Sequence, residues 1–271
     1  MKKARMYSPF VGAVAGLFGS MVGVGGGIIM NPMLLNICRT IPQRVLTGTS
    51  LAAVFSTALA GSSTFASSSC VDIPSTVLIS SSAMLFSPIG ARLTAILDCN
   101  TLRACLGYFL FAAAPLVPLK AMLISSPDDD TVDKQDSSSS WIESIQEMPL
   151  GSVLKMLGIG AVAGTASGLL GIGGGTIVTP MLALTTTLDH SVVLGTSLTS
   201  MIPPAMTGIV SHYYLGNVDM RLAAGLILGT SIGGFVGSTC ALKAPQGVLE
   251  GIFSLGMIFL GRKTLASVAT K

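Results

Sequence analysis

Charged residues are scarce in this chain of 271 residues, in which Asp, Glu, Lys and Arg together make up only 10%. An average soluble domain carries about 25% charged residues, so a soluble surface cannot be assembled from this composition. Half of the residues are hydrophobic, and the mean hydropathy is +0.75. Long uncharged runs are what bilayer-spanning helices require, so we predict an all-α integral membrane protein.

Residue patterns typical of catalysis, metal binding or nucleic-acid binding are also lacking. The only histidines are His190 and His212, and the five cysteines form neither a CxxC pair nor a metal-ligand spacing with them. Without a Ser/His/Asp constellation or paired carboxylates, we expect no enzymatic activity, no metal and no cofactor. The net charge of +3 lacks the clustered basic residues of a nucleic-acid partner. We expect the cysteines to be packing residues, with a sulfur-handling thiol at Cys70 or Cys105 as the alternative.

An internal duplication organises the chain. GAVAGLFGSMVGVGGGIIMNPML, at residues 12–34, aligns with GAVAGTASGLLGIGGGTIVTPML, at residues 160–182, with 13 identical residues among 23. The tetrapeptide GTSL recurs at 48–51 and 195–198. The apolar N-terminal stretch could be taken for a signal peptide, but the same stretch recurs in mid-chain, where it cannot be one. We therefore predict a first membrane repeat at 6–124, an acidic, Ser-rich solvated linker at 125–149 and a second membrane repeat at 150–268.

Each repeat holds four apolar segments. They lie at about 10–38, 45–67, 73–97, 102–124, 153–187, 192–214, 220–242 and 246–266. The first segment of each repeat contains the pattern GxGGG, and glycine costs about 1 kcal/mol against alanine in a helix interior. A proline follows five residues after each glycine run. We predict that these two segments are broken by the glycines or re-enter the membrane surface from which they came.

The distribution of Lys and Arg favours re-entry over eight full crossings. With re-entry, most of the basic residues near segment ends fall on one side, as the positive-inside rule requires. Lys120, Lys155 and Lys243 are exceptions. The re-entrant topology predicts a multi-pass protein of the cell (inner) membrane with cytoplasmic N- and C-termini. Three crossings per repeat would insert the two copies in opposite orientations, the inverted-repeat plan of many secondary transporters.

The glycine runs are the strongest candidates for a solute-binding site. Backbone outside a helix is tolerated at membrane depth only where protein or a water-filled cavity satisfies its polar groups. Helix N-termini facing such a cavity favour an anion. The hydroxyls of the GTSL motifs can donate to a solute or bond back to the preceding turn. The candidate substrate-binding residues are Gly23, Gly25, Gly26, Gly27, Thr49, Ser50, Gly171, Gly173, Gly174, Gly175, Thr196 and Ser197.

Other polar and small residues have simpler interpretations. The glycines of 229–237 and 160–164 have the small-xxx-small spacing of close helix packing. Asp72 and Asp219 are explained by helix capping. Arg44, His190 and His212 are the ionisable residues nearest the predicted cavity, and we interpret them as interfacial residues with ligation as the alternative.

With these duplicated motifs, G-x-GGG-x4-P and a downstream GTS, the sequence resembles the sulfite exporter TauE/SafE family over nearly its whole length. The resemblance implies transport of sulfite, sulfonates or related small sulfur anions. The family motif also places Pro32, Pro180, Gly48 and Gly195 at the candidate site. The long acidic linker and the more polar third segment depart from the family pattern.

The leading hypothesis is a secondary transporter of small anions, with alternating access at the interface of the two repeats. Its partners would be a small anionic solute and the lipid bilayer. A passive, channel-like anion pathway is one alternative, and a membrane scaffold subunit that transports nothing is another.

Overall fold

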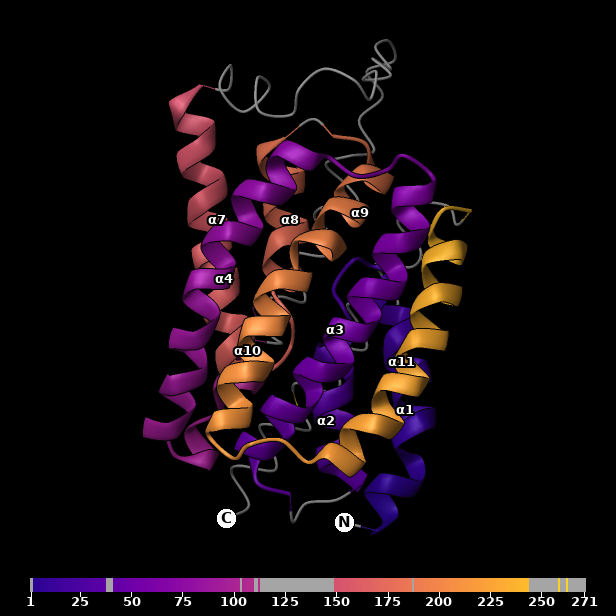
Figure 1. The fold of residues 1–271 in the computed structure, drawn as a ribbon, viewed down its shortest axis with the longest axis vertical. Helices are drawn as coiled ribbons and strands as arrows, with labels where there is room; N and C mark the ends of the chain where they lie inside the picture. The colour runs from indigo at the N-terminus through magenta and orange to yellow at the C-terminus, as the bar shows by residue number, and fades with distance from the viewer. Residues whose placement is uncertain are drawn as a thin grey trace.

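The computed structural model describes residues 2–37, 41–102, 104–109, 112, 149–186, 188–243, 258 and 262. Its helices are α1 (Lys2–Met21), α2 (Gly27–Ile37), α3 (Gln43–Ser67), α4 (Ile73–Ile96), α7 (Leu150–Leu170), α8 (Gly175–Thr185), α9 (His190–Ser200), α10 (Ile202–Tyr214) and α11 (Met220–Ala241). No strand occurs in this part of the chain, which confirms the all-α prediction for it (Figure 1). The linker at 125–149 and the segments at 102–124 and 246–266 lie largely outside the described residues.

Five of the described helical segments are long and apolar enough to cross a membrane. They are Gln43–Ser67, Ile73–Ile96, Leu150–Leu170, His190–Tyr214 and Met220–Ala241. The span His190–Tyr214 is divided at Met201, between α9 and α10. Pro203 and Pro204 follow at once and lack the N–H groups that would bond back to α9, so the helix restarts there.

Aspartates cap the N-termini of two of the long helices. Asp72 Oδ2 accepts a hydrogen bond from Ser75 N, 3.2 Å away, at the start of α4. Asp219 Oδ1 accepts from the N–H groups of Arg221 and Leu222 at the start of α11. Both carboxylates satisfy amide groups that a helix N-terminus leaves without partners, which confirms the capping interpretation.

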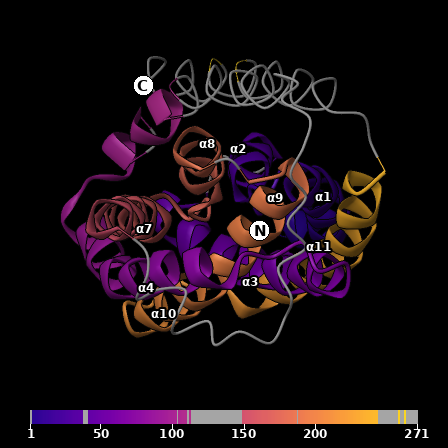
Figure 2. The same ribbon diagram turned by 90° about the horizontal axis from the view of Figure 1, so that it is seen from above.

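Two tightly packed helix pairs flank the bundle, α1 with α11 and α4 with α7 (Figure 2). A Cβ placed on Gly233 would lie 2.1 Å from the carbonyl oxygen of Ala13, and one on Gly164 would lie 2.4 Å from that of Ala83. No larger residue fits there without moving a backbone. The packing role predicted for these glycines is therefore confirmed.

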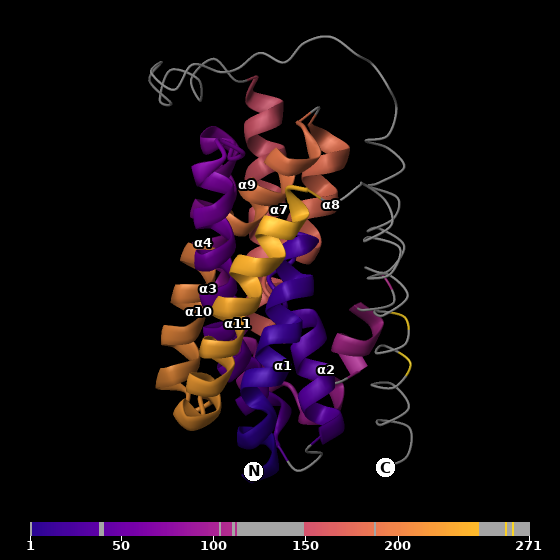
Figure 3. The same ribbon diagram turned by 90° about the vertical axis from the view of Figure 1, so that its right-hand side faces the viewer.

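Helix α3 runs through the middle of the bundle, between the two flanking pairs (Figure 2). It is the most enclosed of the five long segments, with 78% of its most apolar stretch buried. The short helix α2 lies beside α1 near the end of the bundle where the chain begins, and α8 lies beside α7 toward the opposite end (Figures 1 and 3). The two interrupted helices thus approach the centre of the molecule from opposite ends.

Candidate functional site

Both glycine runs interrupt their helices. Helix α1 ends at Met21 and α2 begins at Gly27, while α7 ends at Leu170 and α8 begins at Gly175. The φ angles of Gly23 and Gly26 are +76° and +77°, in the left-handed region where a side chain is unfavourable. Gly171 has φ +66° and caps α7 by donating its N–H to Ser167 O at 2.9 Å. The backbone itself therefore requires glycine at these turns.

The two loops lie against each other. A Cβ on Gly27 would lie 2.7 Å from Gly171 O, and a Cβ on Gly175 would lie 2.6 Å from Gly23 O. The side chain of Val54 packs on Gly173. All eight candidate glycines are buried. The structure thus brings together the two loops that the sequence separates by about half the chain, and it packs them without a gap between their backbones.

The GTSL serines bond to these loops across the two halves of the chain. Ser50 Oγ, on α3, donates to Gly171 O at 2.7 Å. Ser197 Oγ, on α9, donates to Gly23 O at 2.9 Å, and Thr179 Oγ1 lies 2.8 Å from that same oxygen. Because carbonyls at a helix C-terminus lack intrahelical partners, these hydroxyls supply the missing donors.

The GTSL threonines make a second set of crossed contacts. Thr49 Oγ1 accepts from Asp219 N at 3.0 Å, and Thr196 Oγ1 accepts from Asp72 N at 2.8 Å. Thr49 also donates to Val45 O, one turn earlier. Each threonine therefore ties its own helix to the start of a long helix in the other half, whereas the serines beside them reach the glycine loops.

Sequence reasoning missed one polar residue at the second loop, Asn31, and interpreted another, His212, as an interfacial residue. Asn31, on α2, donates from Nδ2 to Leu170 O at 2.8 Å. His212, on α10, is fully buried, and its Nε2 lies 2.8 Å from Gly168 O. Asn31 could have been found from the repeat, because it aligns with Thr179 and both positions hold a polar residue inside an apolar run. Burial of His212 depends on α7, which the local sequence does not reveal.

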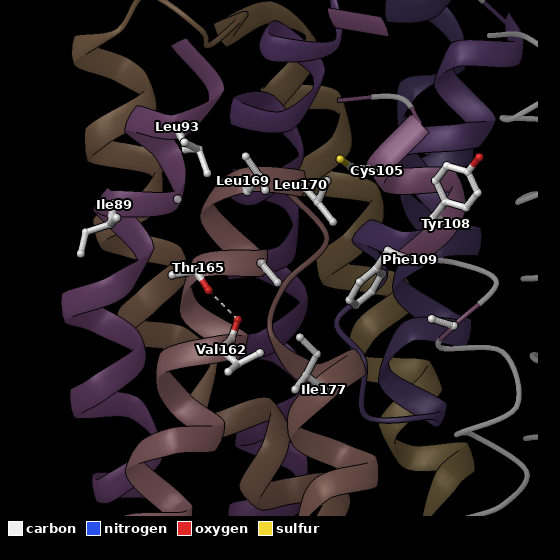
Figure 4. Close-up of a pocket in the computed structure, with 13 residues that line it drawn as sticks. Ile89, Leu93, Cys105, Tyr108, Phe109, Val162, Thr165, Leu169, Leu170 and Ile177 are labelled. Atoms are coloured by element: carbon white, nitrogen blue, oxygen red, sulfur yellow. Dashed lines mark hydrogen bonds between the residues drawn. The ribbon is translucent and has the colours of Figure 1, made fainter. Parts of the chain in front are cut away.

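An apolar cleft lies beside the second loop. Its volume is about 620 Å³, and it lies between α4, α7, α8 and the residues Cys105, Tyr108, Phe109 and Ala112 (Figure 4). Leu170 and Ile177, which flank the second glycine loop, form part of its wall, with Leu93, Tyr108 and Val162 around them. Such a lining suits hydrocarbon and offers an anion few donors.

The thiol of Cys70 lies in the connection between α3 and α4. Burial raises the pKa of this thiol above its ordinary value, and the carboxylate of Asp189 raises the pKa further. Its Sγ donates to Ser68 O. A raised pKa keeps the sulfur protonated near neutral pH, and the thiolate is the reactive form. Cys70 is therefore poorly suited to sulfur chemistry. Cys105 lines the apolar cleft.

Buried helix interruptions, paired loops and apolar spans are features of a polytopic membrane transporter, and comparison with known proteins agrees. The family model "Sulfite exporter TauE/SafE" matches residues 9–264, so the chain belongs to this family of membrane transporters. The chain is 26% identical to "Probable membrane transporter protein YunE" of Bacillus subtilis over 93% of each chain. It is 25% identical to "Probable membrane transporter protein YdhB" of the same organism, over 87% of this chain and 89% of the relative. It is also 29% identical to "Probable membrane transporter protein MJ0441" of Methanocaldococcus jannaschii, over 64% of this chain and 60% of that protein. No solved structure matches the chain.

Proposed function

We propose that this protein is a secondary transporter of small anions, with sulfite, sulfonates or related sulfur oxyanions as its substrates. Membership in the TauE/SafE family supports transport and directs attention to sulfur anions. The observation that carries the proposal is the crossed packing of the two glycine loops, each held by hydroxyls from the other half. Such a junction between two interrupted helices is the usual place for a transporter's solute site.

The two halves form an inverted repeat in this proposal. Ser50 bonds to Gly171 as Ser197 bonds to Gly23, and each partner is displaced by 147 or 148 residues from its counterpart. The Thr49–Asp219 and Thr196–Asp72 contacts repeat the same exchange. The α1–α2 and α7–α8 pairs lie toward opposite ends of the bundle (Figure 3). A two-fold relation between halves of opposite orientation accounts for all of these observations.

The ends of the interrupted helices favour a negative solute. Serine, threonine and asparagine side chains donate to the carbonyls that end α1 and α7, which offsets the negative ends of those helices. Helices α2 and α8 begin at the same loops, and their N-terminal N–H groups carry the positive end of the helix dipole. We assign anion binding to the eight loop glycines with Ser50 and Ser197. Thr49 and Thr196 position these helices through the amides of Asp219 and Asp72.

Alternating access follows from the closed packing of the loops. With all eight glycines buried, a solute reaches the junction only when the loops separate. Two equivalent sets of contacts provide two equivalent ways to open, one toward each end of the bundle. Exchange between two such states moves the solute across the membrane.

We also propose a location in the cell (inner) membrane with the N-terminus, and the C-terminus with it, in the cytoplasm. Helix α3 begins, and α4 ends, toward the end of the bundle where α1 begins (Figure 1). Arg44 is the second residue of α3, and Arg92 lies in the last turns of α4. The positive-inside rule assigns that end to the cytoplasm, although Lys155 and Lys243 lie toward the other end. Reporter fusions in the 125–149 linker and at the C-terminus should report opposite sides, and the same side for both would refute this topology.

Flux in proteoliposomes tests the transport proposal directly. We expect saturable, counterflow-competent movement of sulfite, thiosulfate or sulfoacetate under an imposed gradient. Flux without saturation or counterflow would favour the channel-like pathway. No flux of any small anion would contradict both transport hypotheses and would leave the scaffold subunit as the remaining hypothesis.

Glycine variants distinguish a transporter from a scaffold. Replacing Gly26 or Gly174 with Leu should abolish flux, because a Cβ on Gly26 would lie 2.5 Å from Ala15 O and one on Gly174 would lie 3.0 Å from Ala163 Cβ, so each side chain would push its loop away from the helix before it. Gly158→Leu is the matched control, since a Cβ there would meet nothing within 4 Å. Elution of each detergent-solubilised variant as a folded species separates lost function from lost folding.

A further inference from the structure

The C-terminal end of α7 is surrounded by polar side chains from three other helices. Its carbonyl oxygens at Gly168, Leu170 and Gly171 lie within hydrogen-bond distance of His212 Nε2, Asn31 Nδ2 and Ser50 Oγ, from α10, α2 and α3 respectively. All three side chains are fully buried. The cluster adjoins the second glycine loop, so it belongs to the junction at which the proposed anion site lies.

The histidine has no counterpart in the first half. Phe65 occupies the position equivalent to His212, 147 residues earlier in the chain. A Cβ on Gly48 would lie 2.9 Å from His212 Cβ, and a Cβ on Gly195 would lie 2.9 Å from Phe65 Cβ. The two rings therefore fill equivalent spaces against the GTSL glycines. Because an apolar ring meets the packing requirement in one half, packing does not explain an imidazole in the other.

The hydrogen bond to Gly168 determines which nitrogen of His212 is basic. A carbonyl oxygen only accepts, so Nε2 carries the hydrogen and donates it. Nδ1 of the neutral ring is then the lone-pair nitrogen. It is buried and has no hydrogen-bond partner among the described residues, and the same holds for Asn31 Oδ1. A buried acceptor without a partner is rare in folded proteins and costly, so its presence at this junction points to a proton or ligand that occupies it.

We propose that His212 is the proton-binding residue of the transport cycle, which makes the solute's co-substrate a proton. This inference rests on the proposed anion transport. A proton from the aqueous phase binds Nδ1 while Nε2 keeps its bond to Gly168, and the resulting imidazolium lies beside the junction that receives the anion. Release of the proton and the anion on the other side of the membrane returns the His212 ring to its neutral form. One proton crosses with each anion, and no bond of the solute is broken.

The physical basis of coupling is shared desolvation. A lone cation and a lone anion each lose hydration energy when they enter the interior, and adjacent opposite charges recover part of that loss. Each of the two therefore favours binding of the other, and this coupling is reciprocal. A carrier that holds only one of them binds it more weakly, so net accumulation of the anion depends on the proton gradient.

Among the described residues, no other ionisable side chain near the ring takes the place of His212 as the proton-binding group. The charged side chains on the helices around the ring are Arg44 on α3, Arg92 on α4 and Lys155 on α7, and Tyr213 and Tyr214 follow it on α10. In the described part of the chain the ring bonds only to Gly168. Arg44 donates to Leu97 O instead.

Two substitutions isolate the titrating nitrogen. His212→Gln keeps a donor for Gly168 O but cannot take up a proton in this range, and His212→Phe copies the equivalent position of the first half. In proteoliposomes with a trapped pH dye and an outward-directed or inward-directed sulfoacetate gradient, wild-type protein should move protons together with the anion, and this anion carries no titrating proton of its own near neutral pH. Both variants should lose proton movement and proton-driven accumulation by about tenfold or more. Anion counterflow, which needs no net proton transfer, should remain at a high anion concentration, which compensates for weaker anion binding in the absence of the imidazolium. His190→Gln is the matched control, with wild-type behaviour expected.

The outcomes separate this inference from the transport proposal. Wild-type flux of anion without proton movement would overturn the role of His212 and leave anion transport standing. Proton movement in His212→Gln equal to that of wild type would also overturn it. So would loss of counterflow in a folded His212→Gln protein at a saturating anion concentration, because the ring would then be required for the solute itself. Absence of any anion flux in wild type would refute both proposals together.

Discussion

At the first glycine loop, the carbonyl of Gly23 accepts from Ser197 and lies 2.8 Å from the hydroxyl of Thr179. At the second loop, Gly171 accepts from Ser50, while Asn31 bonds mainly to the neighbouring carbonyl of Leu170. The backbone turns are alike at two aligned pairs, Gly23 with Gly171 and Gly25 with Gly173, and the donors differ. A helix end inside a membrane needs donors for its carbonyls, but hydroxyl and amide groups both meet that need. The loops therefore share the geometry of their first turns, and the side chains that bond to them differ.

The equivalent glycines Gly26 and Gly174 should respond unequally to substitution, although the repeat aligns them. Gly26 has φ +77°, and a Cβ there would lie 2.5 Å from Ala15 O. Gly174 has φ −68°, and its nearest neighbour is a side-chain atom, Ala163 Cβ, at 3.0 Å. We expect Gly26→Ala to cost about 2–5 kcal/mol in unfolding free energy and Gly174→Ala about 1 kcal/mol or less.

Thermal or denaturant unfolding in detergent measures the loss of unfolding free energy in Gly26→Ala and in Gly174→Ala. Gly158→Ala, at a position where a Cβ meets nothing within 4 Å, is the control and should be neutral or slightly stabilising. Equal losses for Gly26→Ala and Gly174→Ala would show that the loops are more alike than their backbone angles indicate.

The threonines should behave as a symmetric pair. Thr49→Val removes the acceptor for Asp219 N, and Thr196→Val removes the acceptor for Asp72 N. Each change leaves a partly buried amide without its partner, at a cost of about 1–3 kcal/mol. Unfolding of the two single variants should give similar losses, with little change in the KM for the solute. A large KM change in a stable variant would instead place the threonine in the solute site.

Alanine substitutions of Ser50 and Ser197 should differ in their effect on unfolding free energy by a smaller amount. After Ser197→Ala, Thr179 still lies 2.8 Å from Gly23 O. After Ser50→Ala, the remaining donor to Gly171 O is Asn31, at 3.4 Å. We expect Ser50→Ala to be the more destabilising by about 1 kcal/mol. The double variant Ser197→Ala with Thr179→Val should remove the difference, and a milder Ser50→Ala would contradict the idea that Thr179 acts as a second donor.

Cys70, which aligns with Asn217 in the second half, should show the smallest effect, in reactivity and not in stability. Because its pKa is raised, the thiolate is scarce at neutral pH, and alkylation should be slow there and accelerate as pH rises through the elevated pKa. In a variant that keeps Cys70 as its only cysteine, Asp189→Asn should lower the pKa and speed alkylation at a given pH. A rate indifferent to Asp189 would mean that burial alone sets the pKa.

Local sequence predicted the features that depend on neighbouring residues. The helix interruptions follow from the glycine runs, the starts of α4 and α11 from Asp72 and Asp219, and the close helix pairs from small-xxx-small spacing. The division of the sixth segment at Met201 could have been predicted from the two prolines after it. The burial of His212 could not, because it depends on α7, which is 44 residues away in the chain.

Composition and the long uncharged runs by themselves determined that the chain is a helical membrane protein, and the repeat determined which positions correspond. Only the tertiary structure decided that each half supplies the donors for the other half's loop. The physical reason is the range of the interactions. Glycine and aspartate act through the backbone within one turn, so the sequence displays their effect directly. The bonds of Ser50, Ser197 and Asn31 join residues 121 to 174 positions apart, and a hydroxyl or amide in an apolar helix has many possible partners until the helices pack.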